Sequence, residues 1–318
     1  MSFTTPFRVA AVNAESAKWN VNDGVQLANR IVTEAVTAGA SLVVFPELWL
    51  PGFANTDSVA PPEDFQIYAD NSIEVGSSVW NDLVQVSVRN SAYVAMSFSE
   101  REGQNLFIAQ VLIGPDGSVL DRRRKFKPSG PERFLFSDAP DHENLNVVDT
   151  PLGRIGSLSC AEHWKPQMTF PMMAQNENIH ICAFPYNLDK TKIPAEHLDS
   201  HIWWEFYEMN ETSATNYAMI SNTWVIMASV GRSIVVNNFG QVVASAENSD
   251  SNFALADVDP ASFGDAYDNV FTWATLQRME NSFPGPRVPD EFTDTDAMVD
   301  YRTVDTSKYK LKYGVQID

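Results

Sequence analysis

The chain has 318 residues, of which 44% are hydrophobic and 20% charged, enough apolar material for one large α/β domain and too much for a disordered polypeptide. Its 22 basic against 41 acidic residues give a net charge of −19, which repels phosphate backbones and anionic lipid surfaces and argues against nucleic-acid and membrane partners. No apolar run approaches the roughly 18 residues of a spanning helix, and the N-terminus lacks a signal-peptide pattern, so we expect a cytoplasmic globular protein.

The first elements read as a strand–helix–strand unit. Phe7 to Val12 is an apolar run typical of a buried strand. Asn22 and Asp23 are candidate N-caps for a helix whose apolar residues recur at helical spacing up to Val36. Leu42 to Phe45 is a second short apolar run, closed by a proline, which again predicts a buried strand.

The alternation continues along the chain. A helix is predicted over Val79 to Asn90, a strand over Tyr93 to Phe98, and a hairpin joins Phe107–Ile113 to Val119–Arg122. The second half repeats the pattern, with predicted strands at Gly153–Cys160, Ile179–Phe184, Trp224–Ser229, Ser233–Val236 and Gln241–Ala244, and helices at Pro166–Asn176 and Glu208–Tyr217. Strands alternating with helices indicate an α/β fold. Residues 1–283 are predicted to form a single domain, and the polar, turn-rich residues 284–318 a C-terminal arm.

Reactive side chains follow two of the predicted strands. Cys160 ends one apolar strand and Glu47 follows another, at the edge where α/β sheets gather functional groups. A thiolate at Cys160 would be a strong nucleophile, whereas Cys182 lies inside a strand and is interpreted as core. Lys125 belongs to a run of five cations in six residues, which could create a positive potential, and Glu132 follows seven residues later.

Three motifs together resemble the nitrilase branch of the carbon–nitrogen hydrolase superfamily over roughly residues 7 to 260. They are PELWLPGF around Glu47, RRKFKPSGPER around Lys125 and DTPLGRIGSLSCAEHWKP around Cys160, and they occur in the family's order. The resemblance implies an αββα sandwich built from two similar halves. It also implies a catalytic set of Glu47, Lys125 and Cys160, with Glu132 as a second glutamate that orients Lys125 or a water molecule.

The activity implied by the resemblance is hydrolysis of a nitrile to a carboxylic acid and ammonia, without a metal or organic cofactor. Glu47 would take the thiol proton, and Cys160 would attack the nitrile carbon. Lys125 and the backbone N–H of Ala161 would stabilise the developing charge. Two alternatives within the family stay open: an amidase or carbamylase, and a cyanide or nitrile hydratase that stops at the amide. A catalytically silent scaffold is the alternative from another class, and the intact catalytic set argues against it.

The substrate pocket is predicted from residues that follow strand ends. Phe53, Trp164, Tyr186 and Asn187 are its expected walls, which favours a nitrile with an aromatic or branched apolar group. Ala161 stands where nitrilases usually carry tryptophan, so the pocket is expected to be wider or differently shaped.

Other features carry weaker predictions. His197 and His201 have the spacing of zinc ligands but no matching third ligand, and His163 is interpreted as a structural hydrogen-bonding residue. We expect a homodimer or a larger closed oligomer rather than a spiral, because the connection between residues 229 and 233 is short. Candidate interface residues are Met168, Phe170, Met172, Met173 and the aromatic cluster from Trp203 to Tyr207.

Overall fold

The computed structural model describes residues 5–53, 62–139, 145–195, 205–247 and 250–262. The predicted arm, its boundary at residue 283, the histidines at 197 and 201, and the tryptophans at 203 and 204 lie outside these ranges. Within the ranges, no helix combines the length and the apolar character that crossing a membrane would require.

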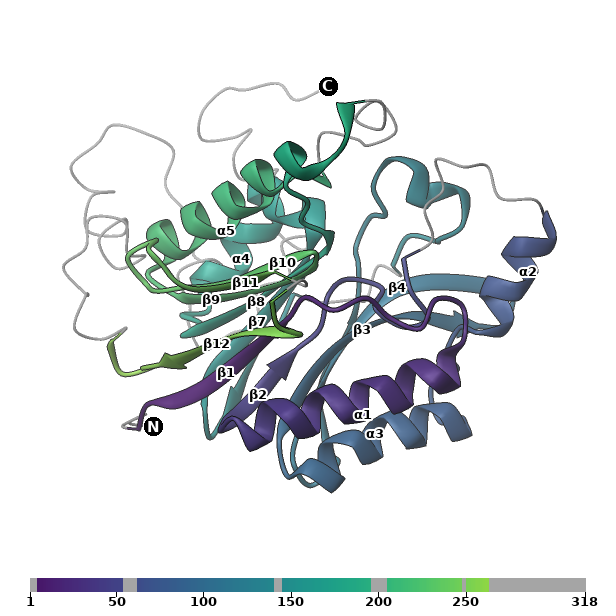
Figure 1. Ribbon diagram of the computed structural model, residues 1–318, viewed down its shortest axis with the longest axis horizontal. Helices are drawn as coiled ribbons and strands as arrows, with labels where there is room; N and C mark the ends of the chain where they lie inside the picture. Colours follow the sequence, from purple (N-terminus) through teal and green to yellow (C-terminus); the bar gives the residue numbers. More distant parts are fainter. Residues whose placement is uncertain (1–4, 54–61, 140–144, 196–204, 248–249, 263–318) are drawn as a thin grey trace, which may run out of the picture.

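Two six-stranded sheets stack face to face, and helices cover both outer faces (Figure 1). The first sheet has the order β12-β1-β2-β3-β4-β5, with bounds Phe253–Val258, Phe7–Val12, Ala40–Val44, Tyr93–Glu102, Asn105–Ile113 and Val119–Arg124. The second has the order β11-β10-β9-β8-β7-β6, with bounds Val242–Glu247, Arg232–Val236, Trp224–Val230, Ile179–Tyr186, Gly153–Ser159 and Val147–Thr150.

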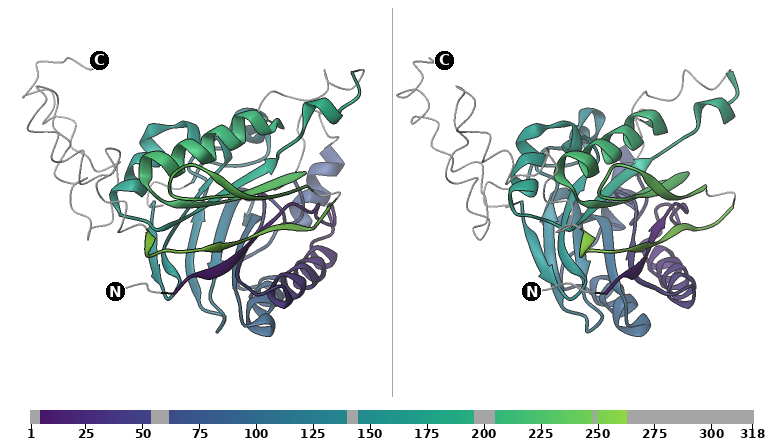
Figure 2. Two further views of the ribbon diagram at one scale, coloured as in Figure 1. Left: turned by 60° about the vertical axis from the view of Figure 1, so that its left-hand side comes forward. Right: turned by 90° about the vertical axis from the view of Figure 1, so that its left-hand side faces the viewer.

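The helices complete a four-layer sandwich. Helices α1 (Val21–Thr37) and α3 (Ser78–Asn90) cover the first sheet, and α4 (Pro166–Ala174) and α5 (Tyr207–Ser221) cover the second. Figure 2 shows α1 and α5 on opposite outer sides of the stacked sheets. The short helix α2 spans Pro62–Asp70, and 3₁₀ turns occur at Gly130–Phe134, Cys160–Trp164 and Lys190–Lys192. The predicted αββα sandwich is confirmed.

The two halves repeat one topology. In each sheet, three neighbouring strands run parallel, two antiparallel strands follow on one side, and one antiparallel strand closes the other edge. The edge strands are β12, which pairs with β1, and β6, which pairs with β7. Both were missed by the sequence analysis, as was α2, because their short segments lack a clear apolar periodicity.

Helix α1 shows how local sequence fixes an element. Its N-cap is Asn20, whose side chain accepts a hydrogen bond from the backbone N–H of Asp23, so the predicted caps Asn22 and Asp23 are wrong by two and three residues. The spacing itself is confirmed, since the helix buries one face that includes Ala28, Ile31 and Val32 against the sheet.

The space between the sheets is filled by small and branched side chains. Val9 and Val44 of the first sheet belong to the same cluster as Ile181 and Ile226 of the second. The contact between the sheets brings the ends of β2, β5 and β7 together, although these strands come from different halves. The segments predicted to carry chemistry follow these three strands.

The proposed interface residues on α4 require a correction. Met168 and Met172 are buried by their own chain, in a cluster with Phe184 and Tyr217. They therefore belong to the core under α4 and are not available to a second subunit.

Candidate active site

Two glutamates hold one lysine at the centre of the site. The Nζ atom of Lys125 lies 2.8 Å from Oε1 of Glu47 and 2.8 Å from Oε2 of Glu132. All three side chains are buried, with Lys125 and Glu47 each about 1% exposed. The backbone N–H of Ser129 also donates to Glu132, so this carboxylate is fixed by the loop that follows the lysine. The structure brings together the three predicted charged residues.

Cys160 starts the turn after β7 in a conformation that side chains rarely adopt. Its φ is 47°, in the left-handed region, where a residue other than glycine is held only by its surroundings. The 3₁₀ turn Cys160–Trp164 begins with a capping box between Ser159 and Glu162. The hydroxyl of Ser159 donates to Oε1 of Glu47 at 2.8 Å, which links the cysteine turn directly to the glutamate.

The electrostatics of the site favour proton transfer near neutral pH. Burial raises the pKa of Glu47 to about 7, although the neighbouring Lys125 opposes the shift. Burial alone would lower the pKa of Lys125, but Glu132 and Glu47 more than offset it and hold that pKa well above its usual value. Burial and the nearby Glu47 carboxylate raise the pKa of the Cys160 thiol, so the thiol needs a base to be activated.

One oxygen of Glu47 is available for that task. Oε1 is engaged by Lys125 and Ser159, while the buried Oε2 has no hydrogen-bond partner among the described residues. A buried carboxylate oxygen without a partner is costly and is a common feature of groups that accept a proton or bind a ligand. Glu47 can thus be held in place through one oxygen and react through the other.

A buried ion pair that the sequence analysis missed joins the lysine segment to the cysteine turn. Arg123 contacts both carboxylate oxygens of Glu162, at 2.8 Å and 2.7 Å. Glu162 also accepts the backbone N–H groups of Phe126 and Ser159, at 2.9 Å and 2.8 Å. Arg123 and Glu162 are 39 residues apart, so no local pattern in the sequence marked this contact.

The cation run is not a positive patch, which corrects the sequence-based expectation. Arg122 and Arg124 both pair with Glu100, Arg123 pairs with Glu162, and Lys127 pairs with Asp138. Each positive charge of the run has a carboxylate partner. Its role in this structure is to tie strands and turns together.

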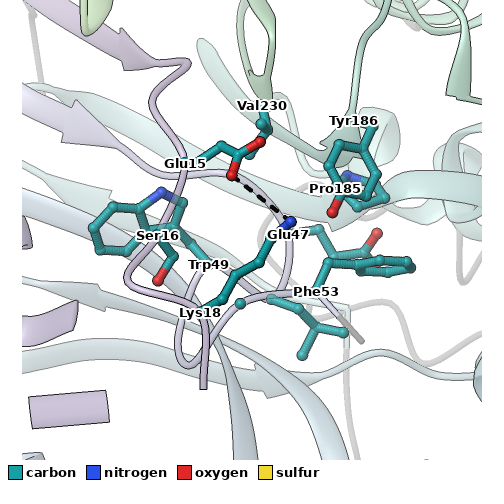
Figure 3. A pocket seen from close by; sticks show the side chains of 11 residues that line it. Glu15, Ser16, Lys18, Glu47, Trp49, Phe53, Pro185, Tyr186 and Val230 are labelled. Carbon is teal, nitrogen blue, oxygen red and sulfur yellow. Dashed lines mark ion pairs between the residues drawn. The ribbon is translucent and has the colours of Figure 1, made fainter. Parts of the chain in front are cut away.

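A small pocket opens onto Glu47 and contains two of the predicted wall residues (Figure 3). The rings of Phe53 and Tyr186 meet edge to face, with centroids 5.6 Å apart and planes at 83°. Lys18 and Glu15 form an ion pair at 3.7 Å along the same pocket, and sequence analysis missed both. They lie in the irregular segment between β1 and α1, where no motif marked them.

The other predicted wall residues lie elsewhere. Trp164 packs in the cluster beneath α4 and α5, and its indole N–H donates to Ser213 at 2.7 Å. Asn187 is buried outside this pocket, where its amide donates to the backbone carbonyl of Arg232 at 3.0 Å. Ala161 is 4% exposed beside Cys160.

The contacts of His163 match the hydrogen-bonding role that was predicted. Its Nδ1 lies 2.8 Å from the carbonyl oxygen of Cys160, and its Nε2 lies 2.9 Å from His180. Both ring nitrogens are therefore occupied away from the thiol. Across the described ranges, no group of three or more His, Cys, Asp or Glu side chains is placed to hold a metal ion.

Comparison with known sequences places this geometry in a family. The family model named carbon–nitrogen hydrolase matches residues 8–268. An arylacetonitrilase from Aspergillus niger is 32% identical over 71% of this chain and 66% of its own length. A cyanide hydratase from Stereum hirsutum is 37% identical over 57% of this chain and 50% of its own length. The matched part of the chain thus spans between half and two thirds of these relatives.

Solved structures share the fold. Nit3 from Saccharomyces cerevisiae, a member of branch 10 of the nitrilase superfamily, superposes with a TM-score of 0.65 at 17% identity, covering 83% of this chain and 94% of its own. A mutant amidase from Nesterenkonia sp. AN1 in complex with acrylamide gives a TM-score of 0.64 at 18% identity, covering 87% and 97%. With the family match over most of its length, this chain belongs to the carbon–nitrogen hydrolase family.

Proposed function

We propose that the protein is a nitrilase that converts an organic nitrile and two water molecules to a carboxylic acid and ammonia. The observation that carries the proposal is the buried cluster of Glu47 and Lys125, joined through Ser159 to the turn that starts at Cys160. Glu132 holds the lysine from its other side. This arrangement supplies a nucleophile, a base and a fixed positive charge within one water-poor site.

The first half of the reaction forms a thioimidate. Oε2 of Glu47 takes the thiol proton as the sulfur of Cys160 bonds to the nitrile carbon, and the proton passes to the nitrile nitrogen. Lys125 and the Ala161 N–H stabilise the negative charge that develops on that nitrogen. Glu132 keeps Lys125 protonated and in position, because its carboxylate stabilises the ammonium.

The second half releases the two products. A water molecule that Glu47 deprotonates adds to the thioimidate carbon. The nitrogen receives the proton taken from the water and the hydroxyl proton of the adduct, and it leaves as ammonia. The remaining thioester on Cys160 is hydrolysed by a second water, which returns the thiol and gives the carboxylic acid. Glu47 serves as base and acid in alternate steps, which suits a group whose pKa lies near 7.

For the substrate we propose a nitrile with an aromatic side, as in the arylacetonitrile class. The edge-to-face pair of Phe53 and Tyr186 beside Glu47 offers an apolar aromatic surface, and arylacetonitrilases are among the relatives. A hydratase that stops at the amide is the second candidate, because cyanide hydratases are also among the relatives. An amidase or carbamylase is the third.

Ammonia release across a panel of nitriles and amides, with product identification by mass spectrometry, tests the proposal. Carboxylic acid and ammonia from phenylacetonitrile are the expected result. Accumulation of the amide without ammonia would favour the hydratase. Ammonia from amides and none from nitriles would overturn the nitrilase in favour of the amidase.

We also propose a cytoplasmic homodimer or larger closed oligomer. Both cysteines are free and buried, as is usual in reducing compartments. Of the predicted interface residues, Phe170, Phe206 and Tyr207 are half-buried, and Met173 is half-buried against the core cluster beneath α4. Light scattering after size exclusion decides the assembly, and a mass near 35 kDa would exclude the dimer.

A further inference from the structure

A hydrogen-bonded network of buried polar side chains lies behind the cysteine turn, between the second sheet and helices α4 and α5. Nδ1 of His163 lies 2.8 Å from the Cys160 carbonyl oxygen, and its Nε2 lies 2.9 Å from Nε2 of His180. Nδ1 of His180 lies 3.0 Å from Glu177, and the hydroxyl of Tyr217 donates to the other oxygen of Glu177. His180 and Glu177 are completely buried, and the other two side chains nearly so.

The hydrogen bonds of this network determine the proton positions one after another. A carbonyl can only accept, so Nδ1 of His163 carries a proton. Burial, with His180 nearby, lowers the pKa of His163 to about 3, so its ring is neutral and its Nε2 is an acceptor. Nε2 of His180 must therefore carry a proton, and one further proton lies between Nδ1 of His180 and Glu177.

The fold leaves room for this side-chain network. A methyl group added at Gly156 of β7 would lie 2.2 Å from Oε2 of Glu177 and 2.6 Å from Met172. The strand that leads to Cys160 can therefore carry only glycine there while Glu177 keeps its position. His163 also stacks on Phe184, with ring centroids 5.4 Å apart, so the ring cannot turn away easily.

The Cys160 carbonyl, which accepts a hydrogen bond from the network, and the Ala161 N–H, a donor in the proposed active site, belong to one peptide group. The Cys160 carbonyl and the Ala161 N–H are the two polar ends of the same planar unit and point in opposite directions. The carbonyl faces His163, and the backbone N–H of Ala161 acts on the Cys160 sulfur in the direction that lowers the pKa of the thiol. A hydrogen bond received at the oxygen fixes the plane of the peptide and withdraws charge from its N–H, which becomes a stronger donor.

We propose that Glu177, His180 and His163 are positioning residues that align and polarise the Cys160–Ala161 peptide, so that the Ala161 N–H stabilises the thiolate and the charge that forms on the substrate nitrogen. The proposal rests on the proposed function, in which Cys160 is the nucleophile. It assigns a role to a histidine that touches no reacting atom. It also explains why a network of polar side chains is buried behind the turn, where apolar side chains would suffice for packing.

Steady-state kinetics with phenylacetonitrile test the proposal on the full chain. His163→Leu removes the donor, and kcat is expected to fall roughly tenfold, less than the loss on deleting a whole oxyanion donor, with KM within about twofold. His163→Asn returns an N–H at the position of Nδ1 and is expected to recover most of kcat. Thr223→Val is the matched control. It removes a buried hydrogen bond from the Thr223 hydroxyl to the backbone carbonyl of Glu177 and leaves the side-chain network intact.

Nitrogen NMR of protein labelled at its five histidines tests the proton positions directly, while the split between kcat and KM and its rescue by His163→Asn separate positioning from a purely structural role. In the wild type, the signal of His163, identified by its loss in His163→Asn, should show a neutral ring protonated at Nδ1. A ring protonated only at Nε2, or wild-type kcat in a folded His163→Leu, would overturn the proposal. Activity that persists in Cys160→Ala would instead refute the proposed function. If the enzyme acts only on amides, the same variants are measured with an amide substrate.

Discussion

The Ser159 hydroxyl donates a 2.8 Å hydrogen bond to Oε1 of Glu47, across 112 residues of sequence. In the proposed mechanism, the residue before the nucleophile thus supports the base that activates the nucleophile. This bond lowers the pKa of Glu47, against the larger effect of burial that raises it. Its loss has a measurable consequence on the acid side of the activity profile.

Ser159→Ala is expected to shift the acid limb of kcat/KM upward by roughly half a pH unit, because one hydrogen bond to the charged form of Glu47 is lost. Above that limb, activity should remain within a few-fold of wild type. The measurement is a pH profile from 5 to 9 with phenylacetonitrile. A limb that stays at the wild-type pH would show that the Ser159 bond does not contribute to the ionisation of Glu47.

The wild-type profile itself is predicted from the shift in Glu47. Its pKa is raised to about 7 by burial, and the base must be ionised to take the thiol proton, so kcat/KM should fall as the pH drops below about 7. Glu47→Gln should lose nearly all activity while the protein stays folded. A profile flat from pH 5 to 7 would exclude Glu47 as the base.

Cys160 and Cys182 offer a matched pair for the covalent step, since both thiols are free and buried. Cys160→Ala should abolish turnover, and Cys182→Ala should keep most of it because Cys182 lies in the core beneath α5. Intact-protein mass spectrometry of trapped enzyme should place the adduct on Cys160. An adduct on Cys182 would contradict the assignment.

The Arg123–Glu162 pair is expected to be important for stability. Arg123→Met leaves the buried Glu162 carboxylate without its cation and should lower the free energy of unfolding by about 3–5 kcal/mol. Arg8→Met, in the exposed Arg8–Asp257 pair, is the control and should change stability little. Urea denaturation compares the two variants, and equal effects would mean that the buried pair has no special role.

Ala161→Trp tests the shape of the pocket. Ala161 is 4% exposed next to Cys160, so a large ring there must occupy space near the reacting carbon. The variant should lose more kcat/KM with phenylacetonitrile than with acetonitrile, which serves as the internal control. An equal loss with both substrates would remove Ala161 from the residues that set specificity.

Sequence patterns predicted most of the fold because local signals suffice for buried strands and amphipathic helices. Glu47 and Cys160 were singled out because reactive side chains stand at the ends of apolar runs, but their catalytic roles were inferred from the resemblance of the surrounding motifs to the family. Trp164 was misplaced for a physical reason, since the 3₁₀ turn at Cys160 carries the chain to the helical side of the sheet. The Arg123–Glu162 contact depends on how the sheets stack, which no local pattern encodes.

Strand β12 has a consequence for how the chain folds. It pairs with β1, and the Arg8–Asp257 contact of this ladder joins residues 249 positions apart. During synthesis, β1 presents an unpaired edge until nearly all of the domain has been made. Closing so long a loop is slow, so this final pairing is expected to come late in folding and to leave nascent chains prone to association through β1.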